Sequence, residues 1–180
     1  MRKELEKNLV KICLVLTNKL EECSPNYPFG TCYLVGHCMA EGLKKAGYNS
    51  REVTGTSFFK DKNEKNIIYG NSIVKGINVG FYHTWCILEI DDERVIIDAT
   101  FKFNKVGIKS YFNLKANNKI PDFIITTNSN SWLYSYVEDI KLISQSKDNL
   151  KQVNPNLVNL LIDVVAKNAI EFLSEMKQSA

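Results

Sequence analysis

The sequence contains no long hydrophobic run. No segment approaches the roughly 20 apolar residues that a membrane-spanning helix requires. Near the N-terminus the longest apolar run, residues 12–16, is too short for the hydrophobic region of a signal peptide, and Glu4, Glu6, Lys7 and Lys11 carry charges around it. We therefore expect no membrane contact and a cytoplasmic protein, with export as an effector left open.

An excess of charge of one sign is also absent. Lysine and arginine number 23, aspartate and glutamate number 20, and the net charge is +3. The basic residues are scattered among the acidic ones, whereas a nucleic-acid-binding domain usually gathers them into a stripe or patch. The sequence therefore predicts a mixed charged surface and no nucleic-acid partner.

The chain has only two histidines, and its five cysteines form no Cys-x-x-Cys pair. An odd number of cysteines without framework spacing fits a reducing compartment better than a disulfide scaffold. A zinc site from Cys32, Cys38, His83 and Cys86 would be hard to assemble. The first two are about 240° apart on a helix, and the last two face opposite sides of a strand. We therefore expect no metal and no other cofactor.

The pattern of apolar residues predicts one α+β domain over residues 1–180, because the chain is too short for two ordinary domains. Amphipathic helices are expected over residues 2–22 and about 32–46, followed by strands at 51–59, 67–69, 73–79, 81–90 and 94–99. Consecutive strands favour antiparallel pairing. We expect a looser region over 102–121, a short strand at 123–126, and helices over about 131–146 and 156–177. The core then spans about 24–127 and the helical C-terminal extension about 131–177.

The stretch GTCYLVGHC, residues 30–38, places Cys32 in the first turn of the second predicted helix. Unpaired backbone N–H groups and the helix dipole favour a thiolate there, so Cys32 is a candidate nucleophile. Cys38 lies nearly two turns further on, where this effect has faded. His37 would lie about 140° around the helix from Cys32, so the two side chains do not meet. His83 is left as the candidate base.

The stretch FYHTWCILEIDDERVIIDAT, residues 81–100, is typical of a β-hairpin with its turn at residues 91–92. That register pairs Asp98 with Trp85, so that Asp98 shares one face of the sheet with His83. A slip of one residue would separate them. Asp98 either caps the next turn, or it accepts a hydrogen bond from His83 and leaves the other ring nitrogen facing Cys32.

These two stretches resemble the transglutaminase-like superfamily of papain-like cysteine enzymes. In GTCYLVGHCMAEGLKKAGYNSREVTG the matching positions are Gly30, Cys32, Gly47, Arg51, Val53 and Gly55. The second stretch is similar to the superfamily's His-Ala-Trp and Asp-Pro-Thr block, with matches at His83, Trp85, Asp98 and Thr100 and departures at Thr84 and Ala99. Residues 30–101 also show some likeness to arylamine N-acetyltransferases.

The resemblance implies a papain-like α+β fold, in which the cysteine helix packs on an antiparallel sheet. It also implies acyl transfer from an amide through a thioester, with Cys32, His83 and Asp98 as the catalytic residues. The oxyanion would be held by the Cys32 backbone N–H and a second donor, for which Asn26 is a candidate. Trp85 is a further candidate for contact with the oxyanion or the substrate.

Three functions stay open from the sequence. Hydrolysis of a peptide, protein or small amide, by a peptidase or amidase, is favoured because the chain is small and shows no cofactor domain. Transfer to an amine would make the protein a transglutaminase or N-acyltransferase. A non-catalytic binding module on the same scaffold is the alternative outside enzymes, and the C-terminal helices could contact a protein partner.

Overall fold

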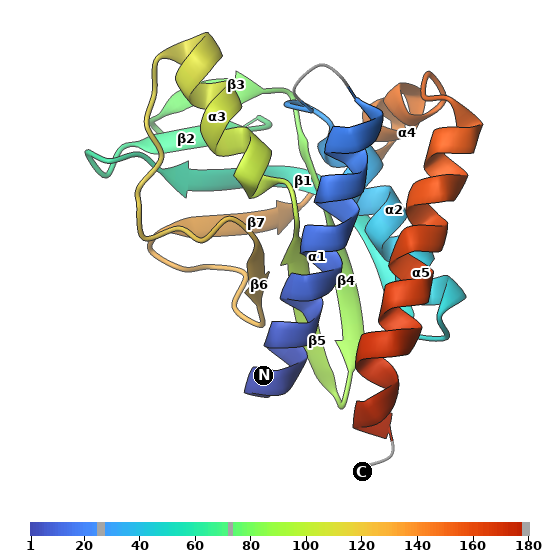
Figure 1. Cartoon of the computed structure of the whole chain (residues 1–180). Coiled ribbons are helices and arrows are strands. Elements are labelled where there is room, and N and C mark those ends of the chain that lie inside the picture. The colour runs from blue at the N-terminus through green and yellow to red at the C-terminus, as the bar shows by residue number, and fades with distance from the viewer. Residues whose placement is uncertain (25–27, 72–73, 178–180) are drawn as a thin grey trace.

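The computed structural model describes residues 1–24, 28–71 and 74–177, and the side chains of the last range as far as Leu173. Three long helices lie side by side over one face of a sheet (Figure 1); they are α1 (Lys3–Cys23), α2 (Cys32–Lys45) and α5 (Pro155–Lys177). The helices expected over 2–22, 32–46 and 156–177 are thereby confirmed. Among the described residues, no helix combines the length and apolar character needed to span a bilayer.

The sheet has seven strands, namely β1 (Asn49–Lys60), β2 (Asn66–Tyr69), β3 (Ile77–Gly80), β4 (His83–Ile90), β5 (Glu93–Asp98), β6 (Ile124–Thr126) and β7 (Tyr134–Glu138). The strand order is β3-β2-β1-β4-β5-β6, and β7 pairs with β1. Every pairing is antiparallel except that of β2 with β3. The expected α+β class with a mostly antiparallel sheet is therefore confirmed. Residue 73 of the strand predicted over 73–79 lies outside the described residues, and the described part of that segment forms a strand only from Ile77 onward.

Strand β1 is the centre of the sheet. Its first half pairs with β4, and its second half pairs with β2 and β7. Gly55 lies where these pairings meet, opposite both His83 and Glu138. A Cβ atom at Gly55 would collide with the carbonyl oxygen of Val137, so only glycine allows β7 to approach β1 here.

The β4–β5 hairpin has the predicted register. Ile90 pairs with Glu93 and Cys86 pairs with Ile97. The φ angles of Asp91 and Asp92 are 51° and 60°, as a two-residue turn matched to the strand twist requires. One further step along the ladder brings Asp98 opposite Trp85 and onto the face that carries His83.

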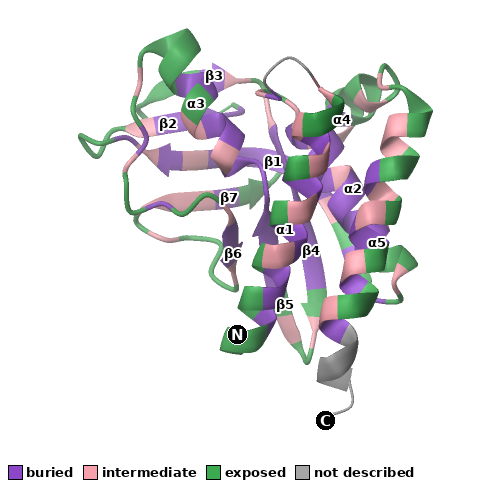
Figure 2. Cartoon of the chain, viewed as in Figure 1, coloured by how far each residue is buried: buried purple, intermediate pink, exposed green. Residues whose placement is uncertain are grey.

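Two apolar clusters occupy the two faces of the sheet. One fills the space between the sheet and helices α1, α2 and α5, and the other lies on the opposite face beneath α3 (Phe101–Phe112). Figure 2 shows the buried residues along the inward sides of α1 and α5 and along β4. Alternation along β4 divides it between the clusters, with Cys86 and Leu88 facing the long helices and Trp85 and Ile87 facing α3.

Helix α3 corrects the expectation of a looser region over 102–121. Phe101, Phe103 and Ile108 are buried, and a Cβ atom at Gly107 would collide with the ring of Phe29. The ring of Tyr111 stacks on Phe29 at 5.4 Å between centroids. These long-range contacts stabilise a helix in a segment whose aromatic residues and glycine have low helix propensity.

The helix predicted over 131–146 is also wrong in its first half. Residues 134–138 form β7, and the 3-10 helix η1 (Ile140–Leu142) and helix α4 (Ile143–Leu150) follow. The sequence YSYVE is rich in residues that favour strands, and β1 offers a free edge at residues 55–59. The C-terminal part of the chain therefore contributes a strand to the sheet as well as helices.

Candidate active site

Cys32 is the first residue of α2, and its side chain is buried with 8% of its surface exposed. The chain enters the helix through Gly30, whose φ of 83° favours glycine, and the Thr31 hydroxyl donates to the carbonyl of Pro28. Cys32 belongs to neither apolar cluster. The first N–H groups of a helix have no partner further along it, so the Cys32 side chain stands at the positive end of the helix dipole.

Gly36, one turn after Cys32, brings α2 against β4. A Cβ atom at Gly36 would lie 2.9 Å from Cγ2 of Thr84 and 3.2 Å from the backbone nitrogen of Trp85. Both helix and strand begin near the upper end of the molecule in Figure 1. Because Thr84 follows His83 directly, this close packing sets the start of α2 beside the strand that carries His83.

His83 and Asp98 form a buried pair. Nε2 of His83 donates to Oδ2 of Asp98 at 2.8 Å, and both side chains are fully buried. Asp98 also accepts hydrogen bonds from the Tyr136 hydroxyl at 2.8 Å, the Thr100 backbone N–H at 2.9 Å and the Thr100 hydroxyl at 2.6 Å. These four donors allow a carboxylate to remain charged in the interior.

The pKa values of the pair are shifted in opposite directions. Burial alone would lower the pKa of His83, but the Asp98 carboxylate and, after it, the Cys32 thiol raise this pKa to about 10. Burial would raise the pKa of Asp98, yet interactions with His83 and Thr100 lower it below its ordinary value. The pair is therefore an imidazolium and a carboxylate at neutral pH.

The second nitrogen of His83 remains available. Nδ1 is buried and has no partner in hydrogen-bond geometry among the described residues. The Cys32 thiol acts on the same ring, since it contributes to the raised pKa of His83. Asp98 thus occupies one ring nitrogen of His83, the other ring nitrogen has no partner among the described residues, and the Cys32 thiol influences the same ring.

Aromatic rings enclose the His83 imidazole. The ring centroids lie 5.3 Å away for Tyr69, 5.8 Å for Phe59 and 6.2 Å for both Trp85 and Tyr136. Such a shell keeps water from the His83–Asp98 pair and strengthens its electrostatic interaction.

The remaining cysteines and the second histidine have other surroundings. Cys38 and Cys86 are buried in the cluster between the helices and the sheet, where burial raises the pKa of both thiols, that of Cys38 to about 12. His37 lies 2.9 Å from Glu52 through Nδ1, which agrees with the argument that it does not serve Cys32. In the described part of the chain, no three ligating side chains are placed to hold a metal ion.

Two further predicted residues have different outcomes. Asn26 lies outside the described residues. Trp85 packs between His83 and Tyr136, lines a cavity of about 350 Å³ and has only 2% of its surface exposed. Contact between Trp85 and a substrate stays a prediction.

Sequence reasoning assigned no role to Tyr136, Thr100 or Tyr69. The Asp-x-Thr spacing of residues 98–100 could have indicated the local hydrogen bonds that Thr100 makes to Asp98. No sequence signal could have identified Tyr136, because its strand was predicted as a helix.

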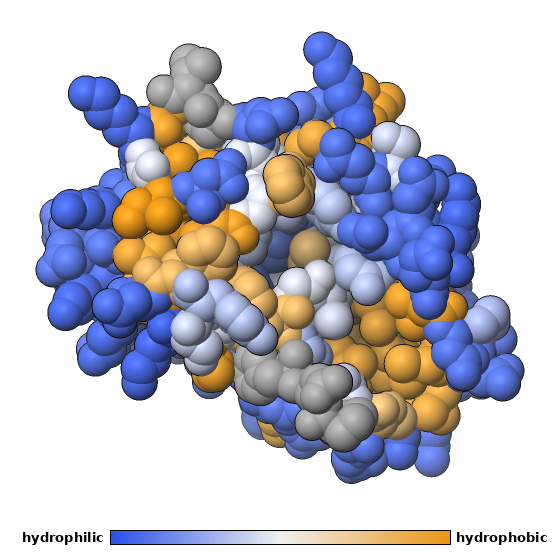
Figure 3. Space-filling model, turned by 90° about the horizontal axis from the view of Figure 1, so that it is seen from above, coloured by the Kyte–Doolittle hydropathy of each residue, from blue (hydrophilic) through white to orange (hydrophobic). Residues whose placement is uncertain are grey.

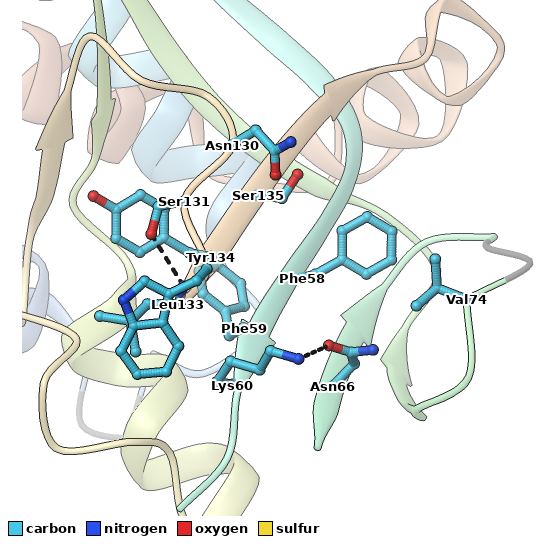
Figure 4. A pocket seen from close by; sticks show the side chains of 11 residues that line it. Phe58, Phe59, Lys60, Asn66, Val74, Asn130, Ser131, Leu133, Tyr134 and Ser135 are labelled. Atoms are coloured by element: carbon cyan, nitrogen blue, oxygen red, sulfur yellow. Dashed lines mark hydrogen bonds between the residues drawn. The ribbon is translucent and has the colours of Figure 1, made fainter. Parts of the chain in front are cut away.

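Figure 3 looks down on the end of the molecule where α2 begins, and this face is hollowed near its centre. A separate cavity of about 430 Å³ lies between β1, β2 and β7, where Phe58, Leu133 and Tyr134 line it and Lys60 donates to Asn66 (Figure 4). Phe59 lines this cavity and also packs on His83, so the Phe59 side chain lies between the cavity and the candidate site.

No family model matches this chain, and no curated protein matches it. Among solved structures, a crystal structure described only as a genomics target is similar, with a TM-score of 0.56 and 13% sequence identity. The match covers 93% of this chain and 79% of that one. At this identity the likeness shows the fold alone, so the same α+β arrangement occurs in a protein of known structure.

Proposed function

We propose that the protein is a cysteine enzyme with a papain-like core that cleaves an amide bond through a thioester on Cys32, as a peptidase or amidase does. The buried His83–Asp98 pair, with its free Nδ1 at the helix-start cysteine, carries the proposal. Perturbed ionisable groups that converge on a potential nucleophile are typical of active sites. The resemblance of the two stretches around Cys32 and His83 to the transglutaminase-like superfamily supports the same reaction class.

The mechanism follows from the positions of the protons. The Cys32 thiolate attacks the amide carbonyl, a sulfur–carbon bond forms, and the electron pair of the C=O bond moves to oxygen. When this intermediate collapses, the carbon–nitrogen bond breaks and Nδ1 of His83 gives its proton to the departing amine. Water then attacks the thioester while His83 accepts a proton, and the carboxylic acid leaves as Cys32 is restored. Asp98 keeps the ring oriented throughout.

The test uses the other cysteines as internal references. Iodoacetamide alkylation at pH 7, followed for each cysteine by mass spectrometry, should modify Cys32 at least about tenfold faster than the exposed Cys23. In His83→Ala the rate at Cys32 should fall to that of Cys23 or below. A Cys32 that reacts no faster than Cys23 in the wild type would overturn the proposal and favour a binding module.

A second experiment identifies the molecule that accepts the acyl group. Wild-type protein acetylated on Cys32 by p-nitrophenyl acetate should lose the acetyl group to water at a rate that added primary amine does not change. Acceleration by the amine, with an amide as product, would assign the protein to the transglutaminases or N-acyltransferases. Cys32→Ala is the control for acetylation elsewhere.

A further inference from the structure

Four buried polar atoms have no hydrogen-bond partner among the described side chains, namely Ser57 Oγ, Tyr69 Oη, His83 Nδ1 and Trp85 Nε1. Three of them belong to neighbouring rings. The centroid of the His83 ring lies 5.3 Å from that of Tyr69 and 6.2 Å from that of Trp85. Ser57 is the cross-strand partner of Tyr69. A buried polar group without a hydrogen-bond partner is destabilising, and native proteins contain few such groups. Their concentration around one imidazole indicates a place that a ligand completes.

Tyr69 has the most sharply fixed position of the four. It is the last residue of β2, and Gly70 turns the chain away with a φ of 105°. Its ring stands edge-on to Phe59 at 5.8 Å, and a Cβ atom at Gly80 would lie 2.9 Å from it. The ring is therefore held between β1 and β3, and its hydroxyl has little freedom to seek another partner.

The surroundings of Tyr69 keep its hydroxyl protonated. Burial raises the pKa of this phenol well above its ordinary value, and negative charge on Cys32 and on Asp98 raises it further. At neutral pH Tyr69 is consequently a hydrogen-bond donor. The Tyr69 ring also lies 5.3 Å, between centroids, from the His83 imidazole, on which the Cys32 thiol acts.

We propose that the Tyr69 hydroxyl is a catalytic residue, which donates a hydrogen bond to the acyl oxygen as Cys32 attacks and forms the oxyanion site together with the Cys32 backbone N–H. This role rests on the proposed function. Negative charge grows on that oxygen when the carbon–sulfur bond forms, and Tyr69 keeps its proton while it stabilises the charge. A donor that is already oriented and unpaired needs no reorganisation at that moment. Tyr69 thereby fills the position for which the sequence suggested Asn26.

Two probes separate this role from any effect on the thiol itself. Acetylation by p-nitrophenyl acetate passes through an oxyanion, whereas alkylation by iodoacetamide at a saturated carbon does not. In Tyr69→Phe, Cys32 acetylation should slow by about 100- to 1,000-fold, and alkylation should stay within about twofold of wild type. Tyr134→Phe, a tyrosine packed at the edge of the same cluster, is the matched control and should change neither rate.

Thermal unfolding distinguishes a functional hydroxyl from a structural one. Tyr69→Phe removes a hydroxyl that has no partner among the described residues, so its melting temperature should equal or exceed that of the wild type. Equal acetylation rates in Tyr69→Phe and wild type would overturn the role of Tyr69 and leave the proposed function intact, and so would equal slowing of acetylation and alkylation. A wild-type Cys32 that is neither acetylated nor rapidly alkylated would overturn both.

Discussion

At the scale of single residues, the candidate site depends on Asp98. Its carboxylate accepts hydrogen bonds from His83 on β4, from Tyr136 on β7 and from Thr100, which lies two residues beyond the end of β5. A buried charge is stable only while such partners are in place, and the loss of one leaves the others imperfectly satisfied. Stability and reactivity are therefore expected to change together when this network is altered.

Tyr136→Phe tests that dependence. The substitution removes a donor from Oδ2 of Asp98, the same oxygen that His83 contacts. Hydrogen bonds to buried charged groups contribute about 1.5–3 kcal/mol, so the free energy of unfolding in a urea titration should fall by that amount. Alkylation of Cys32 should slow as well, because His83 loses part of its orientation. An unchanged free energy of unfolding would mean that Tyr136 does not support the pair.

The raised pKa of His83 predicts a pH dependence of stability. The folded protein keeps the imidazolium up to a pKa of about 10, whereas the unfolded chain releases the proton near the ordinary 6.5. The stabilisation is thus complete below pH 6.5 and is lost as the pH rises, by up to about 1.4 kcal/mol per pH unit. The lowered pKa of Asp98 acts at the other end, where stability is lost in acid.

Urea titrations of wild type and His83→Gln between pH 6.5 and 8.5 measure the contribution of the His83 imidazolium to the free energy of unfolding. The wild-type free energy of unfolding should decline more steeply over that range, by about 2–3 kcal/mol in total. The buried thiols contribute equally to both proteins and cancel in the comparison. Parallel curves would show that His83 is neutral in the folded state.

At the scale of elements, the contact between α2 and β4 positions the nucleophile. Gly36→Ala should force the two apart, because the new methyl group would meet Thr84 at 2.9 Å and the backbone at 3.2 Å. Overpacking of this kind typically reduces stability by about 1–3 kcal/mol. Since Cys32 lies one turn away, its alkylation should slow as it moves from His83.

Gly42→Ala is the matched control on the same helix. Its methyl group would collide with Val165 of α5 and leave the β4 side unchanged. This variant should lose stability, measured by urea titration, while Cys32 in the folded protein reacts as in the wild type. Equal loss of Cys32 reactivity in both variants would contradict a specific role for the Gly36 contact.

The elements that could be predicted from the sequence are those whose pattern is local. Helices α1, α2 and α5 follow from apolar periodicity, and the hairpin follows from its two-residue turn, which is why His83 and Asp98 were placed on one face. Helix α3 and strand β7 depend on distant partners, Phe29 for one and β1 for the other. Tyr136, the partner of the site on β7, was therefore out of reach. The strand that carries Tyr69 was predicted, but its pairing with β1 was not.

At the scale of the whole molecule, the candidate site lies where the two apolar clusters meet. His83 has the aromatic cluster around it, while α2 packs with α1 and α5 on the other face of the sheet. Among the described side chains of α5, the buried ones are Leu161, Val165, Ala166, Ala169 and Leu173. A partner of the C-terminal helices would have to use their outer side, where Leu160 and Ile170 are 41% and 57% exposed.

This packing predicts that α5 is part of one cooperative unit with α2 and the sheet. Leu161→Ala should lower the free energy of unfolding by about 2–5 kcal/mol, because Leu161 is fully buried. Leu160→Ala, its exposed neighbour, should change that value by no more than about 0.5 kcal/mol. Urea titration of both variants measures the difference.

The buried cysteines report how the Leu161→Ala protein opens. The Cys38 thiol donates to the carbonyl of Val158 on α5, whereas Cys86 lies on β4 in the same cluster. If the helix and the sheet open as one unit, alkylation of Cys38 and Cys86 should accelerate by the same factor in this variant. Acceleration of Cys38 alone would show that α5 detaches from α2 independently of the sheet. The start of α2 at Cys32 would then keep its geometry when α5 detaches. Because α2 packs against both α5 and β4, we expect the two rates to rise together.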